Sequence, residues 1–151
     1  MITYQVESLT DCIDEMLPLW SDHYYEVDSD RGAIPMEPDY ARYLEIDEMG
    51  MLSTVTIRDD NTLAGYCIDF ITPSLHQSSN IISVNDLLYI IPNCRRQGCG
   101  KKLLQTVHEH LVKRKVAVHY LAMKVDYPFE AMAEALGYSK VEYNYRKILG
   151  E

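Results

Sequence analysis

The spacing of hydrophobic and polar positions predicts the elements of the chain from its start. Apolar and polar residues alternate over residues 1–7, which is typical of a first strand. After Thr10 the apolar positions recur every three or four residues, which indicates a helix, although Pro18 should kink or interrupt it. The stretch 21–38 is polar and aromatic, and we expect a long loop there, of the kind that often carries function.

The rest of the chain switches between the two periodicities. Strand-like and helix-like segments follow one another, separated by Gly, Pro, Asp and Asn. We expect a helix over 39–49, strands over 52–58, 63–71 and 81–91, a helix over 98–115, a strand over 116–125, a short helix over 128–136 and a last strand over 141–149. The predicted order is therefore β-α-α-β-β-β-α-β-α-β.

The segment 86–104 carries the strongest chemical signal. An apolar strand ends at Pro92, a short turn holds Gly98 and Gly100 among Lys and Arg residues, and a helix begins. Glycine lets the chain turn tightly and lets a ligand reach the main chain. The first N–H groups of a helix have no internal partner and lie at the positive end of its dipole. Such a site favours a phosphate group.

Two common phosphate loops do not fit this segment. A P-loop would need glycine and a hydroxyl where the chain has Arg95 and Lys102. The dinucleotide fingerprint needs a third glycine where the chain has Leu103. The motif that fits is Arg-x-x-Gly-x-Gly over 95–100, after Leu-Tyr-Ile-x-Pro over 88–92. It resembles the acyl-coenzyme A loop of the GCN5-related N-acetyltransferase (GNAT) family.

The resemblance implies a fold, a co-substrate and a set of binding residues. The fold would be α+β, with a mixed, mostly antiparallel sheet of about six or seven strands, helices on both faces and one N-acetyltransferase-like domain over residues 1–151. Acetyl-coenzyme A would be the co-substrate, with no metal. Loop amides would hold its pyrophosphate and the preceding strand its pantetheine arm. The residues expected to bind it are Tyr89, Ile90, Ile91, Arg95, Arg96, Gln97, Gly98, Cys99, Gly100 and Lys101.

A weaker likeness connects the chain to small acetyltransferases of tailed bacteriophages. It rests on the loop around His76, on Leu-Gly-Tyr at 136–138 and on the closing segment 142–147. A phage-encoded protein would work in the cytoplasm of the host.

Charge is unevenly distributed along the chain. The net charge of −9 argues against general nucleic-acid binding. Residues 1–30 hold eight acids and no Lys or Arg, whereas residues 95–115 hold seven of the fourteen Lys and Arg residues. An anionic ligand at the basic segment and a cationic acceptor near the acidic one would explain this division. The alternative is that the acidic surface serves only solubility.

Composition favours the cytoplasm. No apolar run approaches the ~20 residues of a membrane span, and residues 1–7 lack the pattern of a signal peptide. The four cysteines form no CxxC pair and no metal-ligand spacing, which favours reduced thiols. We expect a cytoplasmic protein with an amine acceptor as its partner, without a membrane partner; a homodimer is compatible with the sequence.

Asp86 is the first candidate for the general base of an acetyl transfer. Strand alternation would place it beside Val84, Leu88 and Ile90, where loss of water raises the pKa of a carboxyl. The alternatives are a solvated carboxyl, a bond to a nearby hydroxyl, or a water chain in place of a base. His76 is the second candidate, against a plain surface role.

In the resembling family, main-chain N–H groups of the loop strand polarise the acyl carbonyl. A bulge in that strand, and its divergence from the next parallel strand, would leave the groups free. Here that implies the backbone around Tyr89, Ile90 and Ile91.

One position departs from the resembling family. Many members carry Tyr three residues before the final Leu-Gly-aromatic, and this chain has Ala133 there. The hydroxyls that could protonate the departing thiolate instead are those of Tyr127, Tyr138, Tyr143 and Tyr145; we carry Tyr145 forward as the candidate.

His23, Tyr24 and Glu26 lie in the stretch that borders the acceptor cleft in the resembling fold. We expect them to contact the acceptor, with packing of helix ends as the alternative. The acceptor could be a polyamine, an aminoglycoside-like molecule or a protein lysine. Two rival functions remain: a module that binds acyl-coenzyme A without turnover, and a nucleotide-binding protein that uses the same loop.

Overall fold

The computed structural model describes residues 1–27, 32–96 and 98–150 of the chain. The elements follow the predicted order except for the last one. They are β1 (Ile2–Glu7), α1 (Leu9–Val27), α2 (Tyr40–Glu48), β2 (Leu52–Asp59), β3 (Thr62–Pro73), β4 (Ile81–Ile90), the 3₁₀ turn η1 (Pro92–Cys94), α3 (Cys99–Lys113), β5 (Val116–Tyr120) and α4 (Glu130–Ala135).

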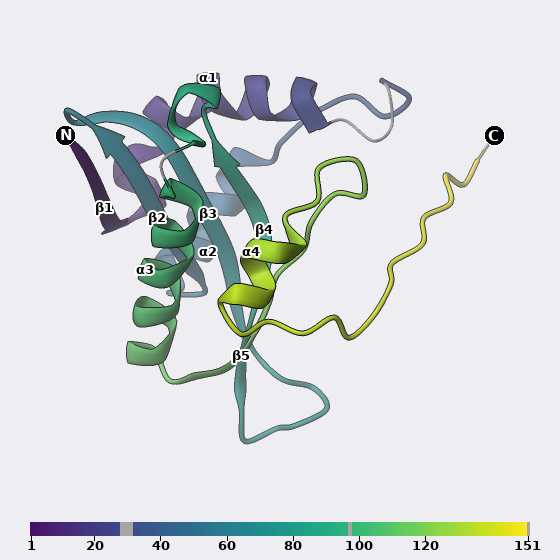
Figure 1. Cartoon of the computed structure of the whole chain (residues 1–151). Coiled ribbons are helices and arrows are strands. Elements are labelled where there is room, and N and C mark those ends of the chain that lie inside the picture. The colour runs from purple at the N-terminus through teal and green to yellow at the C-terminus, as the bar shows by residue number, and fades with distance from the viewer. Residues whose placement is uncertain (28–31, 97, 151) are drawn as a thin grey trace.

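The strands form one mixed sheet in sequence order, β1-β2-β3-β4-β5. Neighbours from β1 to β4 are antiparallel, and β5 runs parallel to β4 because α3 forms the crossover between them (Figure 1). The β2–β3 hairpin turns at Asp60 and Asn61, whose φ angles of 46° and 68° suit a two-residue hairpin turn. The mixed, mostly antiparallel α+β fold is therefore confirmed.

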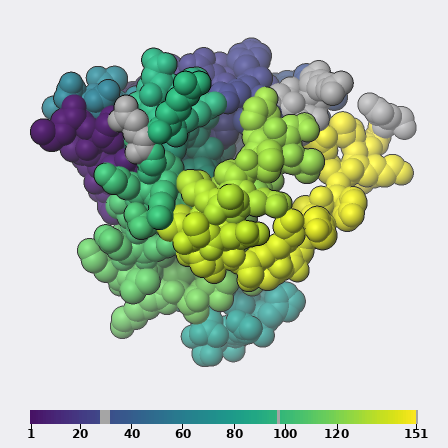
Figure 2. Space-filling view, viewed as in Figure 1, coloured from purple at the N-terminus to yellow at the C-terminus, as the bar shows by residue number. Residues whose placement is uncertain are grey.

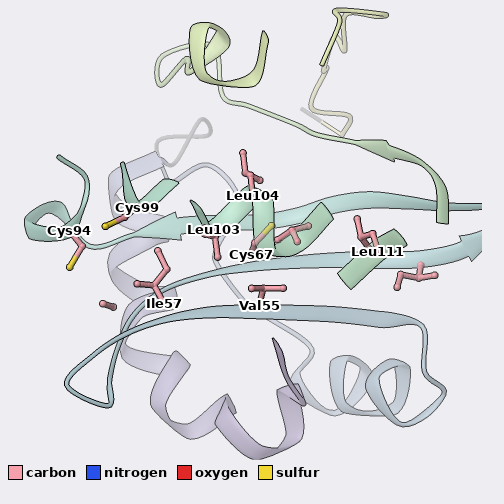
Figure 3. Close-up of a cluster of buried hydrophobic side chains, with 11 residues drawn as sticks. Val55, Ile57, Cys67, Cys94, Cys99, Leu103, Leu104 and Leu111 are labelled. Carbon is pink, nitrogen blue, oxygen red and sulfur yellow. The ribbon is translucent and has the colours of Figure 1, made fainter. Parts of the chain in front are cut away.

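Helices cover both faces of the sheet, and each face has its own hydrophobic core. On one face α1 and α2 cover a cluster that includes Trp20 and Tyr66. On the other face α3 contributes Leu103 and Leu104, which Figure 3 shows beside Cys67 of β3. Burial of this apolar stripe holds α3 against the sheet, which fixes the position of its N-terminal amides at the end of β4.

Helix α1 is longer than the sequence predicts. It continues through Pro18 and through residues 21–27, where we expected a loop. Its buried side chains Cys12, Met16 and Trp20 keep helical spacing on both sides of the proline. Burial of this continuous face outweighs the one backbone hydrogen bond that the proline removes. The loop prediction is wrong for these residues, and the candidate acceptor residues lie on the last turns of a helix.

The last predicted strand is absent. The described residues after α4 contain no strand, and 141–149 instead form a tail along the outside of the molecule (yellow in Figures 1 and 2). Val141, Tyr143 and Tyr145 are 70%, 73% and 94% exposed. An alternating sequence forms a strand where a sheet edge and an apolar surface receive it, and side chains this exposed bury almost nothing. The described sheet therefore has five strands, not six or seven.

Candidate active site

A cleft of about 1170 Å³ opens between the elements that the sequence singles out. Part of its lining comes from the last turns of α1, from the segment 36–38 and from α2. The middle comes from β4, and the rest from the start of α3, from residues 122–129 and from α4. The cleft therefore joins the predicted phosphate loop to the predicted acceptor residues.

Strand β4 contains an extra residue at Asp86. Ile68 of β3 pairs with Leu87, and Asp69 pairs with Asn85, so Asp86 has no partner across this ladder. One unpaired residue on one strand is a β-bulge, which breaks the strict alternation of side chains between the two faces. The bulge predicted for this strand is present, but it lies before the Tyr89–Ile91 segment where we expected it.

The bulge places the Asp86 side chain on the face covered by α1 and α2. There it accepts a hydrogen bond from the hydroxyl of Tyr43 on α2, whereas Leu88 and Ile90 pack into the core beneath α3. The prediction that Asp86 lies beside Leu88 and Ile90 is therefore wrong. Loss of water still raises the pKa of Asp86, and the hydrogen bond from Tyr43 opposes that rise. Both residues line the cleft.

Strands β4 and β5 separate along their length. Their pairing covers Ile81–Val84 on β4 and ends on β5 at Tyr120. Beyond that point β4 has no strand beside it on this edge within the described chain. The expected divergence from the next parallel strand is therefore present.

The separation leaves main-chain amides of β4 open. Ile91 donates its N–H to the carbonyl of Ala64 on β3. Since N–H groups alternate along a strand, those of Leu88 and Ile90 point to the edge that β5 has left. Leu88 and Ile90 both line the cleft. Of the main-chain N–H groups that we expected to be free, that of Ile90 faces the open edge, whereas that of Ile91 is hydrogen-bonded to Ala64.

The loop before α3 has the predicted glycine geometry. Gly98 precedes the helix with a φ of 72°, in the left-handed region that favours glycine. Gly100 lies against α4, where an added Cβ would come within 3.2 Å of the Met132 sulfur. Lys101 lines the cleft together with both glycines. Cys99 is buried in the core beneath α3 and does not line the cleft.

Arg95 is held in place by three contacts. Its terminal nitrogens bond to the carboxylate of Glu26 on α1 at 2.5 and 2.7 Å, and its Nε donates to the carbonyl of Ile90 at 2.7 Å. The guanidinium also lies 5.5 Å from the centre of the Tyr89 ring. The hydrogen bond from Arg95 lowers the pKa of Glu26. The predicted acceptor residue Glu26 is thus the partner of a predicted loop residue.

His23 lies deep in the same wall. Its ring stacks on Tyr89 at a centroid distance of 4.8 Å, and its Nδ1 is 3.1 Å from the hydroxyl of Tyr66. Burial lowers the pKa of His23 to about 4; the charges of Lys124 and Arg95 act in the same direction and that of Glu26 opposes them. The imidazole is therefore neutral at pH 7, and which nitrogen carries its proton depends on the tautomer.

Five described residues of the predicted site do not line the cleft, namely Ile91, Arg96, Cys99, His76 and Tyr145. Arg96 is exposed and does not line it, and Gln97 lies outside the described residues. His76 is exposed in the loop between β3 and β4. Tyr145 is 94% exposed in the tail, although its neighbour Asn144 lines the cleft. A base at His76 or an acid at Tyr145 therefore has no geometric support.

A buried polar network lies next to the cleft. Asp69 accepts a hydrogen bond from Asn85 at 3.1 Å and pairs with His119 at 2.8 Å. The Tyr138 hydroxyl lies 2.7 Å from His119 and 2.5 Å from His108. The network ties the segment after α4 to β3, β5 and α3. It also holds Tyr138 away from the cleft, which Tyr127 lines instead.

Sequence reasoning missed Tyr43 and Tyr66. Tyr43 bonds to Asp86, and Tyr66 bonds to His23. Each lies on an apolar, helix-like or strand-like pattern, so nothing local distinguishes it from a core tyrosine. Their roles depend on contacts between residues far apart in the chain.

The described residues hold no group of three His, Cys, Asp or Glu side chains placed to bind a metal. In the same part of the chain, no helix has the length and apolar character needed to cross a membrane.

Comparison with protein families identifies one match. The model of the acetyltransferase (GNAT) family matches residues 13–138, which include the loop, the cleft residues of β4 and the Leu-Gly-Tyr after α4. No curated protein matches the chain in sequence.

Solved structures with the same fold span the whole chain. A ribosomal-protein-alanine N-acetyltransferase from Brucella melitensis biovar Abortus 2308 has a TM-score of 0.77 at 18% identity, covering 100% of this chain and 99% of its own. A GCN5-related N-acetyltransferase from Ralstonia eutropha JMP134 has a TM-score of 0.79 at 14% identity, covering 99% of this chain and 100% of its own. The aminoglycoside acetyltransferase HMB0005 from an uncultured soil metagenomic sample has a TM-score of 0.75 at 14% identity, covering 99% of each chain. At these identities the likeness concerns the fold.

Proposed function

Because the chain belongs to the acetyltransferase (GNAT) family, we propose that it transfers the acetyl group of acetyl-coenzyme A to an amine. One observation carries the proposal: a cleft in which open amides of β4 continue into a glycine-capped helix N-terminus. The helix N-terminus favours binding of a diphosphate, and the open amides of the strand favour binding of a thioester carbonyl. The similar structures are named for different acceptors, a ribosomal protein and aminoglycosides, so they support the reaction and leave the acceptor open.

The loop residues fit the co-substrate. Gly98 and Gly100 keep side-chain bulk away from the first turn of α3, and Lys101 adds a positive charge beside them. Acetyl-coenzyme A supplies an acetyl group activated as a thioester. In this proposal the amides of Cys99, Gly100 and Lys101 bind the pyrophosphate. The N–H groups of Leu88 and Ile90 bind the pantetheine arm and polarise the acyl carbonyl.

Asp86 is proposed as the proton acceptor. Its raised pKa brings the carboxyl closer to the value that suits a base near neutral pH, and Tyr43 orients it. Asp86 takes one proton from the bound ammonium, which frees the nitrogen lone pair. As the nitrogen bonds to the acyl carbon, the C–S bond breaks, and the second proton that the nitrogen loses balances the departing thiolate. Tyr127, which lines the cleft, is the described tyrosine best placed to protonate the sulfur; otherwise the thiolate leaves unassisted.

A second function is favoured by one observation. Ala133 is buried where many resembling enzymes carry a tyrosine, so the hydroxyl at that position is missing. The alternative is a module that binds acyl-coenzyme A without turning it over.

The test is an acetyl-transfer assay with a panel of amines, following acetyl-coenzyme A by chromatography. Turnover supports the transferase, and binding without turnover by any amine supports the module. Asp86→Asn should lower kcat by about 10²- to 10⁴-fold while leaving affinity for the co-substrate unchanged. Unchanged turnover across pH 6–9 in this variant excludes Asp86 as the base.

The cytoplasm is the proposed location, because the four cysteines are free and buried. The bacteriophage origin, the absence of a membrane or nucleic-acid partner, and a homodimer stay proposals from the sequence alone.

A further inference from the structure

The acceptor side of the cleft is apolar and aromatic. We define it as the lining contributed by α1, by the segment 36–38 and by α2, which lies across β4 from the start of α3. Its apolar and aromatic members are Trp20, Tyr24, Val27, Met36, Pro38 and Tyr43. Such a surface binds hydrocarbon and aromatic groups and disfavours unpaired charge.

The aromatic rings on the acceptor side pack against one another and against neighbouring rings. Trp20 stacks on Tyr40 at 5.5 Å and lies 5.1 Å from Tyr43, and Tyr43 stacks on Phe70 at 6.1 Å. The Tyr24 hydroxyl donates to the carbonyl of Ile34 at 2.9 Å, which ties the segment before α2 to α1. The aromatic surface is therefore part of the packed structure.

Charged side chains are few along the described lining of the whole cleft. Among the described lining residues the carboxylates are Glu26 and Asp86. Glu26 is neutralised by its bidentate bond to Arg95. Lys101 and Lys124 add positive charge, and the charge of Lys124 reaches the wall at His23. Asp86 is thus the one carboxylate of the described lining without a cation beside it.

Apart from Glu26, the described acids of the N-terminal segment lie outside the cleft lining. Glu7 and Glu15 bond to Arg58, away from the cleft lining. Asp11 and Asp14 also lie outside the lining. The expectation of a cationic acceptor rested on these acids, but the described ones contact other parts of the protein or solvent, and Glu26 is paired with Arg95.

We infer that the acceptor is a small primary monoamine on an apolar or aromatic skeleton, which rests on the proposed acetyl transfer. Its ammonium bonds to Asp86, and its skeleton lies on Trp20, Met36 and Tyr43. A second ammonium, as in a polyamine or an aminoglycoside, meets an apolar wall or the positive charge of Lys124. The cost of that unmatched charge sets the specificity.

The experiment compares amines that differ by one charge. Hexylamine and 1,6-diaminohexane share a carbon chain, and 2-phenylethylamine adds a ring. We expect kcat/KM for hexylamine and 2-phenylethylamine to exceed that for 1,6-diaminohexane by at least about tenfold. Binding of acetyl-coenzyme A is measured separately by calorimetry.

A variant tests the wall itself. Met36→Glu places a second carboxylate on the acceptor side and should move the ratio of diamine to monoamine kcat/KM upward several-fold. Met49→Glu is the matched control, because Met49 is 63% exposed at the end of α2 and does not line the cleft. It should leave the ratio unchanged.

The outcomes separate this inference from the transferase itself. If acetyl-coenzyme A binds and the diamine, spermidine, an aminoglycoside or a lysine peptide is acetylated as well as hexylamine, the inference is overturned and the transferase stands. If acetyl-coenzyme A binds and no amine is acetylated, the inference and the transfer fail together. If acetyl-coenzyme A does not bind, the proposed function itself fails.

Discussion

The carboxylate of Glu26 accepts two hydrogen bonds from the guanidinium of Arg95, at 2.5 and 2.7 Å. This pair joins the last turn of α1 to the loop that precedes α3, across 69 positions of sequence. It therefore couples the acceptor side of the cleft to the phosphate side.

A double-mutant cycle should detect this pair. The side chains are 26% and 39% exposed, so solvent screens the attraction, and we expect a coupling free energy of about 0.5–1 kcal/mol between Glu26→Ala and Arg95→Ala. Because Arg95 lowers the pKa of Glu26, this stability is present above the unfolded pKa and is lost as pH falls through the folded one. Urea unfolding at pH 7 and pH 3 measures it; additive single effects at pH 7 would contradict the pairing.

The pH dependence of turnover should respond to Tyr43. The hydrogen bond from Tyr43 lowers the pKa of Asp86 against the effect of burial. Tyr43→Phe removes that bond, so the pKa of Asp86 rises and the acid limb of kcat/KM moves to higher pH. Tyr40→Phe is the control, because Tyr40 stacks on Trp20 and does not line the cleft. An unmoved limb in Tyr43→Phe would remove Asp86 from the base role.

Two glycines with the same left-handed backbone conformation allow binding to be separated from stability. Gly98 and Gly50 have φ angles of 72° and 70°, and an added Cβ meets nothing within 4 Å at either position. A β-branched residue in the left-handed region costs at least about 1–2 kcal/mol, so Gly98→Val and Gly50→Val should lose similar stability. Titration calorimetry should find that only Gly98→Val loses acetyl-coenzyme A. Equal affinities in the two variants would place the co-substrate elsewhere.

Stability should also depend on pH through His23. Its pKa of about 4 lies below the ordinary value of 6.5, so the unfolded chain binds a proton there before the folded one does. The contribution of neutral His23 to the free energy of unfolding is complete above pH 6.5. It is lost as pH falls toward 4, by up to about 3 kcal/mol. His23→Gln should flatten the stability curve over this window relative to wild type. His76→Gln, at an exposed loop position, is the matched histidine control.

The sequence predicts those structural features that depend only on residues close together in the chain. The glycine spacing of the loop, the strand before it and the amphipathic helix after it are all local, and the structure confirms them at Gly98 and α3. Strand alternation singled out Asp86, but it predicted the wrong orientation for the side chain. The bulge that turns it toward Tyr43 exists only in the register with β3.

Other errors have the same origin. Pro18 alone predicts a break, and only the buried face of α1 shows why the helix continues. The tail alternates like a strand, yet it pairs with no strand of the described sheet, and Tyr145 is 94% exposed. The contacts of Arg95 with Glu26, and of His23 with Tyr66, cross long stretches of chain and leave no local pattern.

The most direct measurement compares acetyl-coenzyme A with S-acetylpantetheine, which carries the same thioester and no pyrophosphate. Titration calorimetry of the wild-type protein should give at least about a hundredfold tighter binding of acetyl-coenzyme A, since phosphate oxygens accept several charge-assisted hydrogen bonds. Gly98→Val should bring acetyl-coenzyme A down to the affinity of S-acetylpantetheine. Equal wild-type affinities for the two compounds, or no binding of acetyl-coenzyme A at all, would contradict a pyrophosphate site at the start of α3.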